Sequence, residues 1–108
     1  MRDTLPAKSM KKECGILNLD IKKGNGTHWT CWYKSDSTHC YYFDSYGLAP
    51  PVEFDRYIKM KFFYSTYNIQ QQHLNICGHL CLAFLYECIV KNASVLEVLL
   101  QLKQIFAL

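Results

Sequence analysis

The chain has 108 residues, of which half are apolar and 15% are aromatic, so one small domain with a packed core is expected and wholesale disorder is excluded. Its formal net charge of +3 comes from scattered lysines and arginines, which do not indicate nucleic-acid binding. The sequence shows no secretory signal and no apolar run as long as a membrane span. We therefore expect an intracellular protein of the cytoplasm or nucleus, not secreted and not in a membrane, with reduced cysteines.

The first half of the chain is expected to form strands. Residues 1–20 have the character of a polar arm that leads into a short strand. Residues 24–26, Gly-Asn-Gly, indicate a turn. Aromatic and β-branched residues dominate from His28 to Lys34 and again from His39 to Asp44, which favours two strands joined by a polar turn at residues 35–38.

These two strands are expected to pair as an antiparallel hairpin. Folding about the turn pairs residues whose numbers add up to about 73. His28 and Asp44 satisfy this relation, so a carboxylate is expected within reach of an imidazole. Cys31 and Cys40 are expected to lie opposite each other as packed thiols.

Helices are expected in the second half. A loop at residues 47–51 leads into a short helix over residues 52–60. A further strand is predicted over residues 62–69, followed by a polar loop at residues 70–76.

A longer helix is predicted to begin at Cys77, with Cys81 and Cys88 on its apolar face. Ser94 is expected to cap a last helix, with Glu97 completing a capping box. That helix is expected to bury five apolar residues: Val95, Leu96, Leu99, Leu100 and Ile105.

A histidine, an acid, a glutamine and a cysteine follow one another in an order typical of a cysteine protease. A helix N-terminus stabilises a thiolate, and Cys77 is placed there. His28 would take the thiol proton, and Asp44 would orient the imidazole. The Cys77 backbone N–H and a glutamine side chain from residues 70–72 could stabilise the oxyanion.

The ordered motifs resemble the adenovirus-type cysteine proteases, namely adenain and its relatives in large DNA viruses and Maverick/Polinton transposable elements. This family lies within the ubiquitin-like-protein (SUMO) protease fold. The motifs that carry the resemblance are Gly26-Thr-His-Trp29, Tyr42-Phe-Asp-Ser-Tyr-Gly47, Ile69-Gln70 and Cys77-Gly78-His-Leu-Cys81. The implied fold is α+β, with a small central mixed or antiparallel sheet and the catalytic cysteine at the N-terminus of a buried helix, as in the papain-like superfamily.

The resemblance implies His28 as the base, Asp44 as the acid (a glutamate in adenain itself) and Cys77 as the nucleophile. The oxyanion glutamine has two candidates. Gln70 matches the adenain spacing to Cys77 and Gln71 matches the SUMO-protease spacing. Gln70 is favoured because Ile69-Gln70 also matches the viral pattern.

The implied activity is that of a cysteine endopeptidase acting on precursors encoded by a virus or transposable element, or on ubiquitin-like conjugates, after small residues such as glycine. The partner would be a protein or peptide substrate. We expect no metal or organic cofactor, while a peptide or DNA activator and the oligomeric state stay open. Residues 1–108 are expected to form a single domain. Relatives carry helices ahead of the histidine strand, so a domain truncated at its N-terminus also stays open.

Two other hypotheses compete with the protease. The first is an inactive remnant that keeps the fold and binds a peptide or a ubiquitin-like partner. The second is a small zinc-binding module that uses His73, Cys77, His79 and Cys81. Zinc sites usually add a distant ligand pair, and no distant Cys-x-x-Cys is present. His79 should also point away from both cysteines, so zinc is less favoured.

Overall fold

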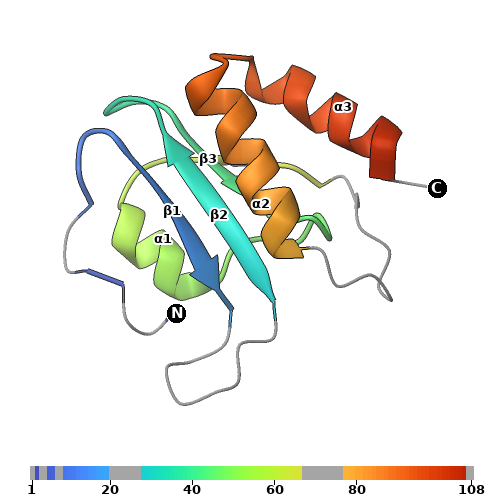
Figure 1. Cartoon of the computed structure of the whole chain (residues 1–108). Coiled ribbons are helices and arrows are strands. Elements are labelled where there is room, and N and C mark those ends of the chain that lie inside the picture. The colour runs from blue at the N-terminus through green and yellow to red at the C-terminus, as the bar shows by residue number, and fades with distance from the viewer. Residues whose placement is uncertain (1, 3–4, 7–8, 20–27, 67–76, 107–108) are drawn as a thin grey trace.

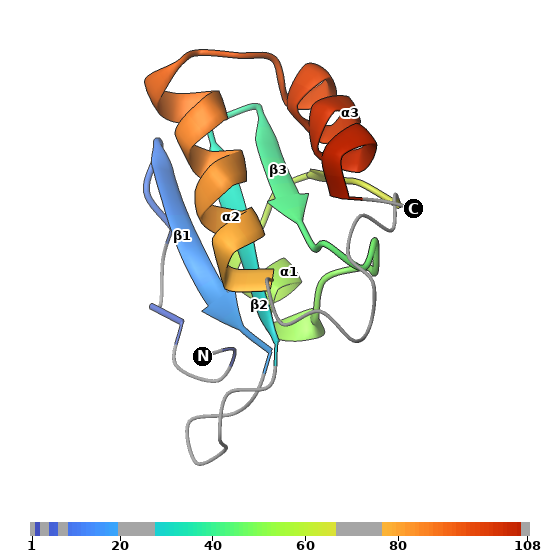
Figure 2. The same cartoon turned by 45° about the vertical axis from the view of Figure 1, so that its right-hand side comes forward.

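The computed structural model describes residues 2, 5–6, 9–19, 28–66 and 77–106, which form an α+β fold on one four-stranded sheet. In chain order the elements are β1 (Glu13–Asn18), β2 (Trp29–Lys34), β3 (Cys40–Phe43), α1 (Val52–Ile58), β4 (Phe63–Tyr64), α2 (Cys77–Leu85), the π-helical turn η2 (Tyr86–Val90) and α3 (Val95–Phe106). The strand order is β1-β2-β3-β4, antiparallel except for the parallel β3–β4 pair. Helix α1 covers one face of the sheet, and α2 and α3 cover the other (Figures 1 and 2).

The predicted hairpin is confirmed as β2 and β3, but its register differs from the expected one. Cys31 lies opposite Phe43, and Cys40 lies opposite Lys34. The expectation that Cys31 and Cys40 face each other is therefore wrong. Because side chains alternate between the faces of a strand, the two cysteines lie on opposite faces of the sheet, in separate cores.

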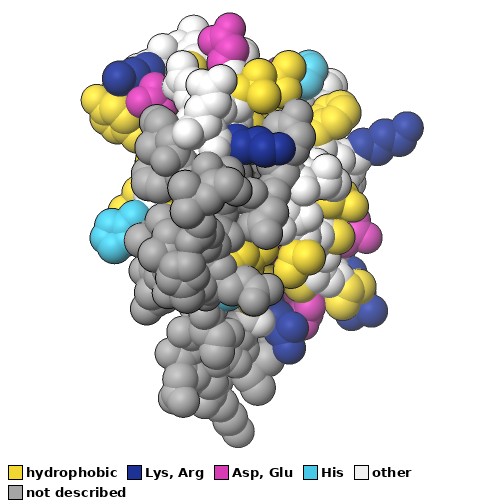
Figure 3. All heavy atoms as spheres, turned by 90° about the vertical axis from the view of Figure 1, so that its right-hand side faces the viewer, with side chains coloured by type: hydrophobic (Ala, Val, Ile, Leu, Met, Phe, Trp, Pro, Cys, Tyr) yellow, Lys and Arg dark blue, Asp and Glu magenta, His cyan; other side chains and the backbone are white. Residues whose placement is uncertain are grey.

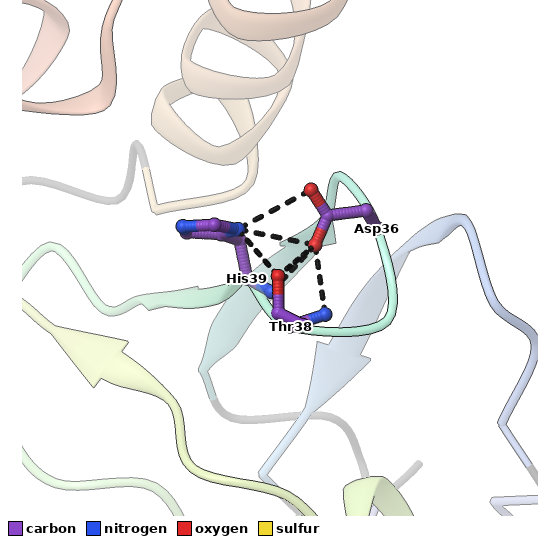
Figure 4. Close-up of polar contacts among 3 residues, drawn as sticks. All are labelled: Asp36, Thr38 and His39. Atoms are coloured by element: carbon purple, nitrogen blue, oxygen red, sulfur yellow. Dashed lines mark hydrogen bonds and ion pairs between the residues drawn. The ribbon is translucent and has the colours of Figure 1, made fainter.

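A turn closed by Asp36 sets this register (Figure 4). The Ser35 backbone N–H donates to the His39 carbonyl at 3.1 Å, so the loop is residues 36–38, shorter than the predicted turn. The Asp36 carboxylate accepts from the Thr38 hydroxyl and backbone N–H, each at 2.7 Å, and from the His39 N–H at 2.9 Å. The hydrogen bonds from Thr38, and then those from His39, hold the pKa of Asp36 well below its usual range.

The face under α1 carries one apolar core centred on Trp32. The Trp32 ring lies 5.7 Å from the Phe54 ring and 5.9 Å from the Tyr57 ring, between centroids. A Cβ atom at Gly15, the cross-strand partner of Trp32, would lie 2.3 Å from the indole, so only glycine fits there. The Glu13 carboxylate accepts from Trp32 Nε1 at 3.3 Å and from the Tyr57 hydroxyl at 2.6 Å.

The segments around α1 differ in length from those predicted. The predicted helix over residues 52–60 is confirmed as α1, which ends where Lys59 takes a left-handed conformation with φ of 52°. The strand predicted over residues 62–69 is much shorter, since β4 comprises Phe63–Tyr64. Residues 67–76 lie outside the described residues.

The opposite face of the sheet packs against α2, η2 and α3. Cys81 and Cys88 are buried in this core, as predicted. The Ser94 cap is also confirmed, since its hydroxyl accepts from the Glu97 N–H at 3.2 Å.

The burial predicted for α3 is confirmed for Leu99 and in part for Val95, and it is wrong for Leu96 and Leu100. Val98, Leu99 and Leu102 are buried. Leu96 and Leu100, which were expected to be buried, are exposed. The side chains at positions 95, 98, 99 and 102 follow helical spacing and face the core. Positions 96 and 100 therefore lie on the side of the helix that faces solvent. The side chain of Ile105 lies outside the described residues.

The described surface is mixed in character. On the face drawn in Figure 3, lysine and arginine side chains are spread among apolar and acidic ones, in line with the scattered basic residues of the sequence. Among the described residues, no helix has the length and apolar character needed to cross a bilayer.

Candidate active site

The open end of the hairpin brings a histidine and an aspartate together. His28 immediately precedes β2, and Asp44 immediately follows β3. His28 Nε2 lies 2.8 Å from Asp44 Oδ1, and the two side chains are 12% and 1% exposed. The contact predicted from the antiparallel pairing is therefore present.

A tight turn holds Asp44 in place. The Tyr46 backbone N–H donates to Asp44 Oδ1 at 2.8 Å, and the Gly47 N–H donates to the Asp44 carbonyl at 2.8 Å. Gly47 has a φ of 73°, a conformation that glycine adopts without strain. The turn also places the Tyr46 ring flat on the His28 imidazole, with centroids 4.5 Å apart and an interplanar angle of 18°.

The first turn of α2 is bound to the start of β2 through one residue. The Trp29 backbone N–H donates to Cys77 Sγ at 3.4 Å. One helical turn further, Cys81 Sγ donates to the Trp29 carbonyl at 3.5 Å. Cys77 thus lies buried at the N-terminus of α2, beside the residue that follows His28.

Stacked rings fix how α2 lies on the sheet. Phe43, which precedes Asp44, stacks on Phe84 of α2 at 4.7 Å with an interplanar angle of 4°. The buried cysteines beside this contact are packing residues. Burial raises the pKa of the Cys31 thiol well above its usual value and that of Cys88 to about 11. Both therefore remain protonated thiols at neutral pH.

The ring nitrogen of His28 that faces Asp44 is Nε2. An ionised carboxylate only accepts hydrogen bonds, so with an ionised Asp44 the proton would be on Nε2. Nδ1 would then hold the lone pair that a general base requires. A thiolate at Cys77 has a helix N-terminus and the Trp29 N–H to stabilise it.

The structure describes only some of the other residues predicted for a site. Gln70, Gln71 and His73 lie outside the described residues, so the oxyanion glutamine stays a prediction. His79 is exposed on α2, whereas Cys77 and Cys81 are buried against the sheet. Within the described part of the chain, no group of three or more histidine, cysteine or acidic side chains could hold a metal ion.

Two features of the site were not predicted from the sequence. They are the Tyr46 ring on His28 and the use of both backbone groups of Trp29 by the thiols of α2. The Asp-Ser-Tyr-Gly sequence was noted as a motif, and its aromatic residue is the signal that could have indicated the first feature.

Comparison with known proteins yields a structural match alone. No protein-family model and no curated protein matches the sequence. The crystal structure of the selenomethionine form of ASFV pS273R protease matches with a TM-score of 0.60 at 21% sequence identity. The match covers 82% of this chain and 38% of that protease.

The chain shares its fold with that protease over the matched part. The α+β class predicted from the sequence, with a small mixed sheet and a cysteine at the N-terminus of a buried helix, is confirmed. The chain spans less than two fifths of that protease, 38% of its length, so the activity of a whole protease is a matter for proposal.

Proposed function

We propose that the protein is a cysteine endopeptidase of the adenain type, with His28, Asp44 and Cys77 as its catalytic residues. One observation carries the proposal, namely the buried His28–Asp44 pair, joined at 2.8 Å, beside the helix N-terminus that bears Cys77. The fold shared with a protease supports it. Neither packing nor a turn requires a buried imidazole–carboxylate pair beside a thiol at a helix N-terminus.

The reaction follows from the roles of the three side chains. His28 Nδ1 takes the proton of the Cys77 thiol, and the thiolate attacks the scissile carbonyl carbon. The Cys77 backbone N–H and, by the resemblance, the Gln70 side chain stabilise the oxyanion. The imidazolium then protonates the leaving amine, which leaves a thioester. Water, deprotonated by His28, hydrolyses the thioester and releases the free thiol.

The substrate class rests on the resemblance. We propose cleavage after a small residue such as glycine, in precursors encoded by a virus or transposable element or in ubiquitin-like conjugates. Trp29 is 41% exposed, and its ring lies against Gly78, next to Cys77, so we propose that it contacts the substrate backbone. An intracellular location and a peptide or DNA activator belong to the same proposal.

The decisive test is labelling with a peptide vinyl sulfone that ends in glycine, with the modified cysteine located by mass spectrometry. We expect selective modification of Cys77 that is lost in His28→Ala. Cys14 is the exposed cysteine, whereas the other five are buried, so Cys14→Ser is the matched control and should leave labelling intact. Preferential modification of Cys14, or none at Cys77, contradicts the proposal. Retained binding of the peptide without modification would then favour the inactive remnant.

A further inference from the structure

The Tyr46 ring covers one face of the His28 imidazole. The centroids lie 4.5 Å apart with an interplanar angle of 18°. The other contact of His28 is at the edge of its ring, where Nε2 lies 2.8 Å from Asp44 Oδ1. The imidazole is thus held at one edge by a hydrogen bond and on one face by an aromatic ring.

The face contact restricts a motion that the hydrogen bond alone does not prevent. The χ2 torsion of histidine is broad and roughly two-fold, so a half-turn exchanges each ring nitrogen with a carbon. In the flipped ring, Nε2 no longer meets Asp44, and Nδ1 no longer occupies the position from which it could serve Cys77. A half-turn sweeps the ring edges out of the plane, and the Tyr46 ring stands in that path.

Side chain and backbone of Tyr46 act on different partners. Its backbone N–H donates to Asp44 Oδ1 at 2.8 Å, and the Gly47 N–H closes the turn on the Asp44 carbonyl. A substitution at position 46 leaves both backbone hydrogen bonds possible. The contribution of the ring can therefore be measured apart from that of the turn.

We propose that Tyr46 is a positioning residue, whose ring holds the His28 imidazole with Nε2 toward Asp44 and Nδ1 free for Cys77. This rests on the proposed function for its catalytic consequence. The same ring offers its π face to the imidazolium that forms when His28 takes the thiol proton, and such cation–π contact favours the charged form. Both effects act on the bond-making steps rather than on substrate binding.

The test compares Tyr46→Leu with Tyr46→Phe in the full chain. Tyr46→Leu removes the stacking ring and is expected to lower kcat about tenfold with little change in KM. Tyr46→Phe keeps the ring and should restore kcat. The pH dependence of Cys77 alkylation should change in the leucine variant alone. Tyr33→Leu, which removes a half-buried tyrosine stacked at 6.3 Å on Tyr41 of the same hairpin, is the matched control.

A second readout does not depend on protease activity. Nitrogen-15 NMR of the His28 ring, assigned by its loss in His28→Ala, reports which nitrogen carries the proton. The wild type and Tyr46→Phe are expected to show one tautomer protonated at Nε2, and Tyr46→Leu a mixture. If the wild type cleaves no substrate but this difference holds, the positioning role stands and the proposed function fails.

Two results overturn the positioning role. One is an unchanged His28 tautomer and unchanged kcat in Tyr46→Leu, given a far-ultraviolet circular dichroism spectrum like that of the wild type. The other is a loss in Tyr46→Phe equal to that in Tyr46→Leu, which would assign the effect to the hydroxyl group.

Discussion

The two ends of the β2–β3 hairpin each carry an aspartate–histidine pair, and the pairs differ in surroundings. At the turn, Asp36 and His39 lie 3.1 Å apart with side chains 45% and 53% exposed. At the open end, Asp44 and His28 lie 2.8 Å apart with side chains 1% and 12% exposed. Exposed ion pairs contribute little to stability because water screens them. A hydrogen bond between buried side chains is stronger, because the protein interior has a low dielectric constant. The first pair shapes a turn, and the second has the surroundings of a chemical site.

The largest expected difference between the two pairs is in catalysis. His28→Ala should lower kcat/KM by about a thousandfold or more, because it removes the proposed general base. His39→Ala should leave kcat/KM within about twofold. Peptide cleavage assays on the two variants measure both. Equal losses at the two histidines would remove the functional distinction between the ends of the hairpin.

The acid of the buried pair should act mainly as an acceptor. Asp44 Oδ1 accepts from both His28 Nε2 and the Tyr46 N–H, while Oδ2 is buried without a hydrogen-bond partner among the described residues. Asparagine can place its oxygen at the first position and its amide nitrogen at the second. Asp44→Asn should therefore cost about tenfold in kcat, and Asp44→Ala about a hundredfold or more.

The matched control for this series is Asp36→Asn, which should leave kcat unchanged. An equal loss in Asp44→Asn and Asp44→Ala would show that the negative charge, rather than the acceptor, is what His28 requires.

The sheet that carries both pairs should be sensitive to one glycine. Gly15→Ala places a methyl group 2.3 Å from the buried Trp32 indole, and overpacking of this kind costs about 1–3 kcal/mol. The free energy of unfolding, from urea denaturation, should fall by that amount. At urea concentrations below the unfolding transition, the variant should retain cleavage activity and the His28 tautomer, because the substitution lies on the α1 side of the sheet. A selective loss of the site would show that Trp32 packing controls His28.

The smallest effect is expected from lowering the pH, which acts on the exposed Asp36–His39 pair. Hydrogen bonds from Thr38 and His39 lower the pKa of Asp36 below its usual range. The contribution of Asp36 to stability is thus present above the unfolded pKa of about 4 and is lost as pH falls through the lowered folded value. The protection of the Thr38 amide proton, that is, its exchange rate relative to the intrinsic rate at the same pH, should fall over that acidic range. Asp36→Asn should abolish this pH dependence of protection, and a persistent dependence in that variant would assign it to another group.

The sequence was sufficient to place the buried pair but not to place its surroundings. His28 and Asp44 were brought together by antiparallel pairing alone, although the register was one residue out. The observed register, extended past β2, puts Tyr46 opposite His28 and leaves Asp44 at a diagonal position within side-chain reach. The missing information was the Asp36 turn, because a polar stretch does not reveal which side chain will close the loop.

The burial of α3 shows a different kind of limit. Leu96 and Leu100 are as apolar as Leu99 and Leu102, so composition does not decide which stripe meets the sheet. Val98, Leu99 and Leu102 share one core with Phe43 and Phe84, so the choice is made by tertiary packing. The Ser94 cap depends on local spacing instead, and it was predicted correctly.

The Asp36 turn also constrains how the gene for this protein can change. Exposed loops usually accept insertions and deletions at little cost. Here, a residue added between Asp36 and Thr38 has two outcomes. If the three-residue loop is kept, the pairing register of β3 shifts by one, its side chains turn to the other face, and Asp44 leaves His28. If the loop lengthens instead, the register survives but the hydrogen bonds that Asp36 makes to Thr38 and His39 must re-form in a different turn.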